Sequence, residues 1–376
     1  MNILINCSTL KIGGGLQVAH SILKEMQEYP QHNYIVVISV EFAALIEREV
    51  FPDNFSLILY STKITISSIW GRNKFLDKIV HDYSIDKALT IFGPAYWKPK
   101  VQHICGYAKP HYVYKNSPFF KDLSTSQRFR LKVKEFLHLH FFKMADVLVT
   151  ENQDVTTNLK KLIRKESIYT ITNYYNQVFE KELEWDKSLK LPDFEGTTML
   201  TISANYPHKN LRVIPKVVEY LIYKYPTFSF RFIITVEKKQ FEDIVDNAIS
   251  QYIVFLGKVN VTSCPFLYKQ SDIMFLPTLL ECFSASYAEA MIMDIPILTS
   301  DLDFAKGLCG DAAVYFDPLS VADIADKIHS LSTDSEKRKK LILEGHTQLE
   351  KFDNYKERAY KYLELLENYE TNNTRP

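Results

Sequence analysis

Two glutamates, Glu281 and Glu289, stand eight residues apart in the segment ECFSASYAEAMIMDIPILTS, residues 281–300. The apolar pattern of this segment predicts a loop, then a short helix, then a buried strand. Carboxylates are unusual in such surroundings unless they bind something. A carboxylate can accept hydrogen bonds from both vicinal hydroxyls of a sugar or ribose, so the pair indicates a hydroxyl-rich ligand.

The start of the predicted helix decides between two roles for Glu289. If the helix begins at Ser284, free backbone amides from Phe283 onward can hold a phosphate or sugar hydroxyls, and Glu289 lies one turn further along. Alternatively, Ser286 and Glu289 form a capping box, in which the glutamate only stabilises the helix N-terminus. The sequence leaves both possibilities open.

A glycine-rich turn, KIGGGLQVAH at 11–20, follows the first predicted strand and opens the first predicted helix. Gly14 and Gly15 allow close approach of the backbone and leave amides free at the helix N-terminus, where phosphate binds readily. Val18 stands where the dinucleotide pattern GxGxxG needs a glycine, and no GK[ST] follows, which disfavours NAD and ATP sites. A plain tight turn is the alternative.

A matching turn in the second half of the chain, TISANYPHKNL at 201–211, places Lys209 just before a predicted helix. A lysine at a strand-to-helix turn can meet a diphosphate as a point charge, although a solvated helix-start lysine is equally compatible. The sequence DLD at 301–303 imitates a metal-binding DxD, but it follows a strand as an ordinary turn, so we expect no metal site.

These turns need strands and helices to position them. Apolar runs of strand type alternate with helical runs from the first residue, which predicts an α/β protein with mainly parallel sheets. The alternation loosens at 173–197, which reads as a linker, and then restarts. A length of 376 residues fits two domains, so we expect two Rossmann-like halves followed by a C-terminal helix.

The amino-acid composition argues against several classes of binding partner. Lys plus Arg (45) balances Asp plus Glu (45), and no basic stripe is interleaved with aromatics, which argues against nucleic acid. The five cysteines lack CxxC spacing, which favours a reducing cytoplasm over a disulfide framework or a zinc site. No apolar run approaches the ~20 residues that span a bilayer. The segment FLHLHFF at 136–142 could touch a membrane surface, but we expect a buried core helix.

Together these motifs resemble the retaining glycosyltransferases of family 4, which have the two-domain GT-B fold and carry E-x7-E, matched by Glu281 and Glu289. The resemblance covers nearly the whole chain. It rests on the glycine loop at 13–15, ADVLVT at 145–150, Lys209, FLGKV at 255–259, the E-x7-E segment and GDAAVYFDP at 310–318. It implies an N-terminal acceptor-side domain and a C-terminal nucleotide-sugar-binding domain facing an interdomain cleft. Their expected bounds are 1–178, with the helix 354–376 packing back on it, and 179–353.

The resemblance also implies roles for single residues in the second domain. Glu281 binds the transferred sugar, Glu289 the nucleotide ribose and Lys209 the diphosphate, while Phe283 and Ser284 offer backbone amides. Members usually carry an arginine about five residues before the lysine. This chain has Ala204 and Asn205 there, so Asn205 becomes a donor-binding candidate and more of the diphosphate charge falls on Lys209. The common EGFG is here ECFS, which narrows the sugar pocket slightly.

In the first domain, the family often places a histidine at the end of a strand, close to the reacting sugar. His103, in VQHICGYA, fits that place better than His111, in AKPHYVY, so we take His103 as a catalytic candidate. A structural histidine beside a strand is the alternative.

The expected activity is therefore transfer of a sugar from a nucleotide diphosphate sugar to a glycan or lipid-linked acceptor, with retention of configuration and without cofactor or metal. The expected setting is surface polysaccharide biosynthesis in the cytoplasm, with possible contact at the inner face of the membrane. A nucleotide-sugar 2-epimerase on the same fold and a non-catalytic nucleotide-sugar-binding module are the alternatives.

Overall fold

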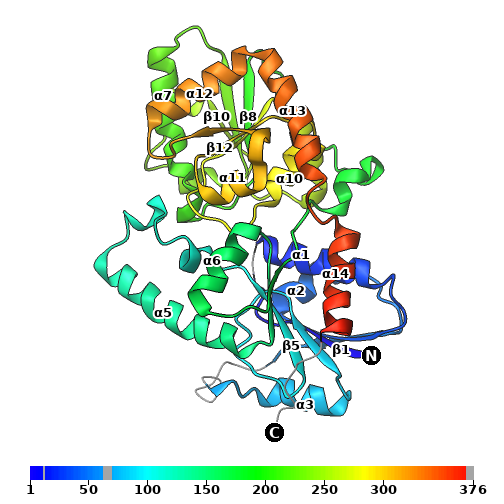
Figure 1. Ribbon diagram of the computed structural model, residues 1–376. Helices are drawn as coiled ribbons and strands as arrows, with labels where there is room; N and C mark the ends of the chain where they lie inside the picture. Colours follow the sequence, from blue (N-terminus) through cyan, green and yellow to red (C-terminus); the bar gives the residue numbers. More distant parts are fainter. Residues whose placement is uncertain (12, 62–69, 370–376) are drawn as a thin grey trace. The chain divides into compact units, whose positions relative to one another are not determined.

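The computed structural model describes residues 1–11, 13–61 and 70–369, which divide into two compact units (Figure 1). Unit 1 comprises 1–113, 123–173 and the chain from 353 onward, and unit 2 comprises 114–122 and 174–352. The contacts thus place the change from one unit to the other at 173/174 and 352/353. The sequence places it at 178/179 and 353/354.

The short segment 114–122 lies inside the first half of the sequence, yet it packs with unit 2. The Ser117 hydroxyl donates to the Leu279 carbonyl at 2.6 Å, and the ring of Tyr114 packs edge-on against Phe304. No sequence pattern marked this segment, because its partners in unit 2, such as Leu279 and Phe304, lie far along the chain.

Unit 1 is built on a seven-stranded sheet in the order β3-β2-β1-β4-β5-β6-β7, and every pairing between neighbours is parallel. Its strands are β1 (Asn2–Cys7), β2 (Asn33–Ile38), β3 (Phe55–Leu59), β4 (Lys87–Thr90), β5 (Gln102–Tyr107), β6 (Val147–Thr150) and β7 (Ile168–Thr170). Its helices are α1 (Gly14–Met26), α2 (Val40–Leu45), α3 (Lys74–Asp82), α4 (Pro110–Val113), α5 (Thr125–Met144), α6 (Gln153–Ile163) and α14 (Tyr355–Asn368).

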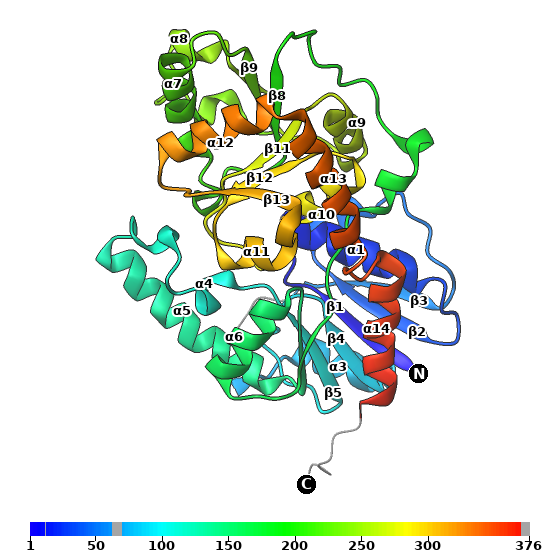
Figure 2. The ribbon, with the colours of Figure 1, turned by 45° about the horizontal axis from the view of Figure 1, so that its top comes forward.

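The C-terminal helix α14 belongs to unit 1, where Tyr362, Leu363 and Leu366 join the same buried cluster as residues of β1 and α1 (Figure 2). The buried guanidinium of Arg358 donates to Asn173 and to the Ser21 hydroxyl, which ties α14 to α1 and to the segment after β7. Residues 370–376 of the expected C-terminal segment lie outside the described residues.

One further contact joins the two places where the chain leaves unit 1 and returns to it. The Thr172 amide donates to the Asp353 carboxylate at 2.7 Å, and the Asp353 amide donates to the Thr172 hydroxyl. The two chain crossings are therefore held side by side within unit 1.

Unit 2 holds a six-stranded parallel sheet in the order β10-β9-β8-β11-β12-β13, and Figure 2 shows β8, β11, β12 and β13 in this sequence. Its strands are β8 (Thr197–Thr201), β9 (Phe230–Ile234), β10 (Ile253–Phe255), β11 (Ile273–Leu276), β12 (Ile297–Ser300) and β13 (Ala313–Phe316). Its helices are α7 (Ile214–Lys224), α8 (Asn247–Ser250), α9 (Cys264–Lys269), α10 (Ala285–Ile292), α11 (Asp303–Cys309), α12 (Val321–Thr333) and α13 (Ser335–Leu349).

The segment expected to be a linker, 173–197, is packed rather than free. Tyr175, Val178 and Phe179 are buried in the core of unit 2, and the Trp185 indole donates to the Val178 carbonyl at 2.8 Å. Its apolar residues have no helical or strand period because they anchor two short 3₁₀ turns, Gln177–Glu180 and Glu182–Glu184.

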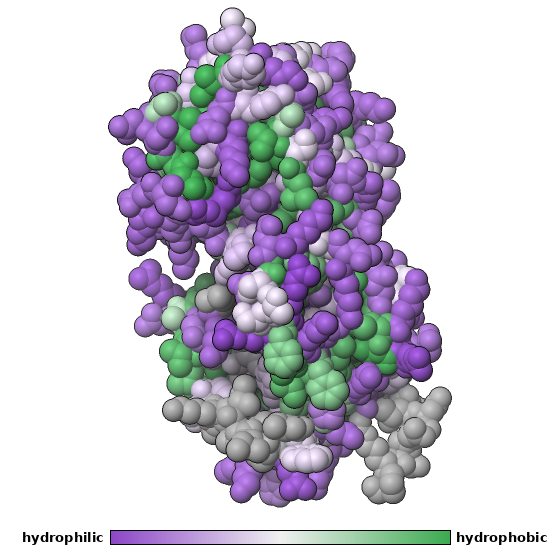
Figure 3. Space-filling model, turned by 90° about the vertical axis from the view of Figure 1, so that its left-hand side faces the viewer, coloured by the Kyte–Doolittle hydropathy of each residue, from purple (hydrophilic) through white to green (hydrophobic). Residues whose placement is uncertain are grey.

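The expectation that 136–142 forms a buried core helix is wrong for half of that segment. It is the C-terminal part of α5, and Phe141 and Phe142 are indeed buried, whereas Phe136 is 75% exposed. Only one face of the helix packs on unit 1, and apolar side chains on the other face remain at the surface. Figure 3, seen from the side where α5 lies in Figure 1, shows green apolar patches among purple ones. Neither α5 nor any other helix of the described residues is long and apolar enough to cross a bilayer.

Candidate functional site

The Lys209 ammonium forms an ion pair with the Glu281 carboxylate, and both side chains are largely buried in unit 2. Lys209 follows the carboxyl end of β8, and Glu281 follows that of β11, the strand that pairs with β8. From β8 the chain proceeds outward to β9 and β10, and then returns to place β11 on the other side of β8. The pair therefore lies at the point where the strand order reverses, which is where α/β sheets bind ligands.

A small hydrogen-bonded loop holds this ion pair in place. The Thr278 hydroxyl lies 3.2 Å from Glu281 Oε1 and 3.1 Å from the His208 carbonyl, to which it donates. The Leu279 amide donates to the same carbonyl at 2.7 Å. The loop after β11 and the turn that carries Lys209 are thus joined directly, so the lysine and the glutamate are positioned as one structure.

Glu289 lies on α10, which begins at Ala285 with Ser284 as its N-cap. The capping-box alternative is therefore wrong, because Ser286 lies inside the helix and Glu289 accepts a hydrogen bond from the Tyr268 hydroxyl at 3.0 Å. Loss of hydration raises the pKa of Glu289 to about 7, although the Tyr268 bond and the positive charge of Lys209 both lower it. Lys209 and Glu281 are thus in direct contact, and Glu289 lies just over one turn into α10, the helix that follows Glu281.

The N-terminus of α10 offers backbone donors beside these charges. The Ser284 side chain makes no capping hydrogen bond, and among the described residues no acceptor takes the amides of Phe283 and Ser284. Phe283 is half-buried and packs edge-on against Phe352, with ring centroids 5.7 Å apart, which fixes the backbone at this turn. The helix end can therefore accept an anionic group.

Asn205 occupies the middle of a tight turn in which the Tyr206 amide donates to the Ala204 carbonyl at 2.9 Å. The next residues bring a histidine towards the site. The ring of His208 stacks on Tyr206 with an interplanar angle of 8°. Burial, assisted by the neighbouring Lys209, lowers the pKa of His208 to about 4, so the ring is neutral at physiological pH.

In unit 1, Gly14 and Gly15 open α1, as the sequence predicts. A Cβ atom on Gly14 would meet nothing within 4 Å, whereas one on Gly15 would make ordinary contact with Phe92 and Leu10. Space is therefore open in front of Gly14, and the N-cap Gly13, with φ 75°, adopts a backbone that favours glycine. Residue 12 of the predicted glycine turn lies outside the described residues.

His103 is the second residue of β5 and is buried, with Nε2 2.8 Å from the Thr90 hydroxyl and the ring near Trp97. The carboxyl end of β5, where ligands of parallel sheets bind, lies four residues later at Tyr107. This geometry favours the structural alternative for His103. His111 lies beyond that end, in the short helix α4.

No group of three or more His, Cys, Asp or Glu side chains within the described ranges is arranged to hold a metal ion. In the DLD sequence, Asp301 pairs with Lys306 at 2.5 Å, and Asp303 is the first residue of α11.

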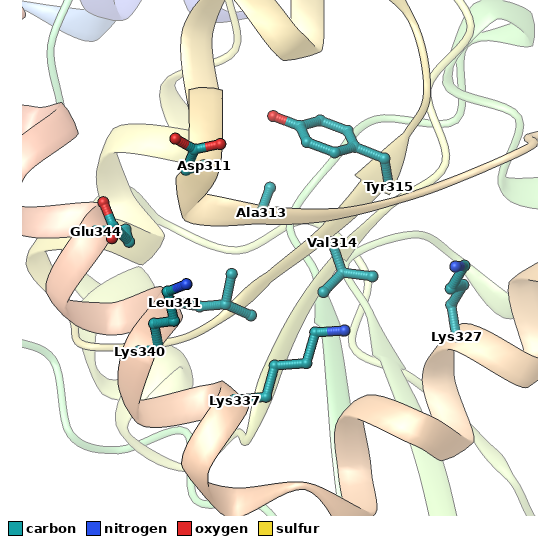
Figure 4. Close-up of a pocket in the computed structure, with 9 residues that line it drawn as sticks. All are labelled: Asp311, Ala313, Val314, Tyr315, Lys327, Lys337, Lys340, Leu341 and Glu344. Atoms are coloured by element: carbon teal, nitrogen blue, oxygen red, sulfur yellow. The ribbon is translucent and has the colours of Figure 1, made fainter.

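Unit 2 also has an open pocket of about 500 Å³ beside β13 (Figure 4). Figure 4 shows Lys327 of α12 and Lys337 of α13 on one side and Asp311 with Glu344 of α13 on the other. Opposite charges nearly balance in its lining. None of the predicted site residues contributes to it, and we assign it no part in the function.

Sequence reasoning missed Thr278, Tyr268 and His208. Thr278 could have been found, because a hydroxyl three residues before a glutamate in a turn is within hydrogen-bonding reach of its carboxylate. Tyr268 gave no signal, since it lies 21 residues before Glu289 on another helix, α9.

Two α/β units, each built on a parallel sheet, are the architecture of the GT-B class of fold. Residues 184–348 match the family model described as Glycosyl transferases group 1. This range contains Lys209, Glu281 and Glu289. No curated protein sequence matches the chain.

Solved structures support the fold over almost the full length. A point mutant of S. aureus TarM, in complex with Fondaparinux, alpha-GlcNAc-glycerol and UDP, has a TM-score of 0.70 and 11% identity, over 97% of this chain and 99% of that one. WaaG, a glycosyltransferase involved in lipopolysaccharide biosynthesis, has a TM-score of 0.70 and 13% identity over 98% and 100%. Anabaena HepE in complex with UDP-glucose has a TM-score of 0.67 and 14% identity over 97% and 100%.

Proposed function

We propose that this chain is a retaining glycosyltransferase of family 4 that transfers a sugar from a nucleotide diphosphate sugar to a glycan or lipid-linked acceptor. The observation that carries the proposal is the junction of Lys209, Glu281 and Glu289 beside the open N-terminus of α10. A cation and free amides suit a diphosphate, and carboxylates suit the hydroxyls on either side of it. The matched family model, Glycosyl transferases group 1, supports transfer of a glycosyl group.

In this proposal the ion pair between Lys209 and Glu281 opens when the donor binds. The Lys209 ammonium turns to the diphosphate, and Glu281, still held by Thr278, accepts hydroxyls of the transferred sugar. Glu289 accepts hydroxyls of the ribose. The amides of Phe283 and Ser284 and the turn at Asn205 border the donor. We also propose Gly14 and Gly15, at the N-terminus of α1 in unit 1, as phosphate-binding residues.

The proposed chemistry is attack on the same face of the sugar that the diphosphate leaves. The acceptor oxygen bonds to the anomeric carbon while the bond from that carbon to the diphosphate breaks, and the acceptor proton passes to a diphosphate oxygen. The charge that develops on the leaving diphosphate is stabilised by Lys209 and the dipole of α10. No cofactor is required by this scheme. We place the reaction in surface polysaccharide assembly at the inner face of the cytoplasmic membrane.

A donor screen followed by product analysis tests the proposal. A nucleotide diphosphate sugar at 100 times its Kd is expected to stabilise the protein by about 2.7 kcal/mol in a thermal-shift measurement. With an acceptor, the best donor should give a glycoside of unchanged anomeric configuration by NMR. Exchange of hydrogen at sugar C2 without transfer would show an epimerase. Tight donor binding with neither transfer nor hydrolysis would show a binding module.

The raised pKa of Glu289 predicts how donor affinity depends on pH. Because the ionised carboxylate accepts the ribose hydroxyls, and its folded pKa is about 7, affinity should be full above pH 7 and fall below it. The ionised fraction falls roughly tenfold for each pH unit below the pKa, so Kd should rise about 100-fold by pH 5. Isothermal titration calorimetry at several pH values measures this.

Glu289→Gln is the matched control for that pH profile. The amide does not titrate, so the variant should bind the donor weakly at every pH and lose the profile. The donor must be an intact nucleotide sugar, because a free nucleoside diphosphate has a terminal phosphate that titrates near about pH 6. His208 stays neutral over this range, since its pKa is about 4. A profile unchanged in Glu289→Gln would exclude Glu289 as the ribose ligand.

A further inference from the structure

The outward face of α5 carries large apolar side chains at the surface. Their exposed fractions are 67% for Phe129, 44% for Val133, 75% for Phe136 and 36% for Leu137. Because a helix turns roughly 100° per residue, these four positions fall within one stripe of the helix surface. Isolated apolar side chains at a surface need no explanation, but four on one face of a helix form a patch that does.

Basic side chains border this stripe on both sides. At about 100° per residue, Arg130 and Lys134 lie along one edge, and Lys132 and Lys143 lie along the other. All four are exposed, and none forms an ion pair with another described residue. The one acidic residue of α5, Glu135, lies on the opposite, inward side. In a chain whose formal net charge is zero, α5 is a local concentration of positive charge.

The inward face of α5 packs on unit 1, so the outward face stays exposed to solvent. His138 lies between the hydroxyls of Tyr96 and Tyr112, at 2.9 Å and 2.8 Å from its two ring nitrogens. The ring of Phe142 is buried against Tyr107, with centroids 4.8 Å apart. A capping box between Ser124 and Gln127 closes the N-terminal end. The helix is therefore preformed, so its docking costs little ordering of the chain.

We propose that this face of α5 docks unit 1 onto an anionic lipid bilayer. The apolar stripe enters the boundary between headgroups and acyl chains, and the flanking arginines and lysines meet lipid phosphates, as in other interfacial helices. A second copy of this chain fits less well, because a symmetric contact through the stripe would bring two rows of cations together. The inference names the surface for the membrane contact of the proposed function, and it can be tested without donor or acceptor.

Vesicle co-sedimentation tests the inference with the full chain. The wild-type protein should bind vesicles of mixed neutral and anionic phospholipid at least about tenfold more tightly than purely neutral vesicles, and added salt should weaken the binding. Phe129→Ser with Phe136→Ser, and separately Arg130→Glu with Lys134→Glu, should each lower binding about tenfold or more. Their thermal unfolding should match the wild type, because all four side chains are exposed.

Helix α13 of unit 2 supplies matched controls for the apolar substitutions and for the charge reversals. Leu343→Ser removes a side chain that is 68% exposed on α13, and Lys337→Glu with Lys340→Glu reverses two exposed charges on the same helix. Both should leave vesicle binding unchanged. Equal binding by the α5 variants and the wild type would overturn the inference. A second result would also overturn it: the wild-type protein does not bind vesicles but self-associates, and Phe136→Ser abolishes the self-association. The stripe would then be a contact between copies of the chain.

Discussion

Lys209→Ala should lower kcat by roughly 10² or more while KM changes little. The ammonium is expected to oppose charge that grows on the leaving diphosphate, and a group that acts on developing charge stabilises the transition state more than the bound substrate. Removing one preorganised donor of this kind typically costs a factor of 10² to 10³. The loss should be at the upper end of the range here, because Ala204 and Asn205 in the preceding turn are uncharged and add no second cation. Steady-state kinetics with the best donor from the screen measures both constants.

Two further variants separate this role from a general effect on folding. Lys209→Arg keeps the positive charge and should recover part of the rate. Lys306→Ala removes a lysine of unit 2 that pairs with Asp301 at 2.5 Å but is about half exposed, and should leave kcat unchanged. If Lys209→Ala turned over at the wild-type rate with only a raised KM, the lysine would bind the donor without assisting departure of the diphosphate.

Gly106→Ala should abolish stable folding of unit 1. A Cβ atom built on Gly106, in β5, would lie 1.7 Å from the carbonyl oxygen of Ile91. The obstacle is backbone in the middle of the sheet, and the Gly106 carbonyl also accepts the Gly93 amide at 2.8 Å, so neither strand can move away. We expect a loss of more than about 3 kcal/mol, the upper range for overpacking, seen by calorimetry as a transition at much lower temperature or as insoluble protein.

Gly14→Ala is the matched glycine substitution. A Cβ atom there meets nothing within 4 Å, and alanine is favoured over glycine inside a helix, so the melting temperature should stay the same or rise slightly. If the backbone at Gly14 approaches the diphosphate as proposed, the added methyl group should weaken donor binding without affecting stability. A Gly106→Ala protein that unfolds like the wild type would show that β4 and β5 can separate at little cost.

The elements of the fold were predictable wherever an apolar period ran uninterrupted. Runs such as YIVVISV and DIMFLP predicted β2 and β11, and the apolar residues after Glu281 predicted the helix α10, although the sequence left its first residue open. The three-residue edge strand β7 was not predicted, because SIYTIT alternates too briefly to stand out. The helix expected from Asn210 begins instead at Ile214, after two 3₁₀ turns that the left-handed Asn210 separates.

The charged residues of the candidate site could be identified from the sequence, because burying a carboxylate or a lysine in an apolar turn costs free energy unless the group binds a partner. The ion pair between them could not be predicted. Lys209 and Glu281 are 72 residues apart, and only the adjacency of β8 and β11 brings them into contact. The sequence also predicted wrongly that the exposed face of α5 would be buried. Local sequence shows that FLHLHFF is apolar, but which side of a helix the rest of the fold leaves uncovered is a tertiary property.

The two hydrogen bonds between Thr172 and Asp353 affect how domains of this chain could be exchanged by protein engineering. Unit 2, apart from 114–122, is a single insertion between residues 173 and 353. The residues of unit 1 next to its two ends, Thr172 and Asp353, are hydrogen-bonded to each other. Domains whose ends lie together tolerate excision and exchange, because the host fold closes without them. Unit 1 with its own helix α14 is thus a host domain, and residues 174–352, taken together with 114–122, form an exchangeable insert. Under the proposed function, exchanging this insert would change the sugar that is transferred, while the part of the chain that carries α5 stays the same.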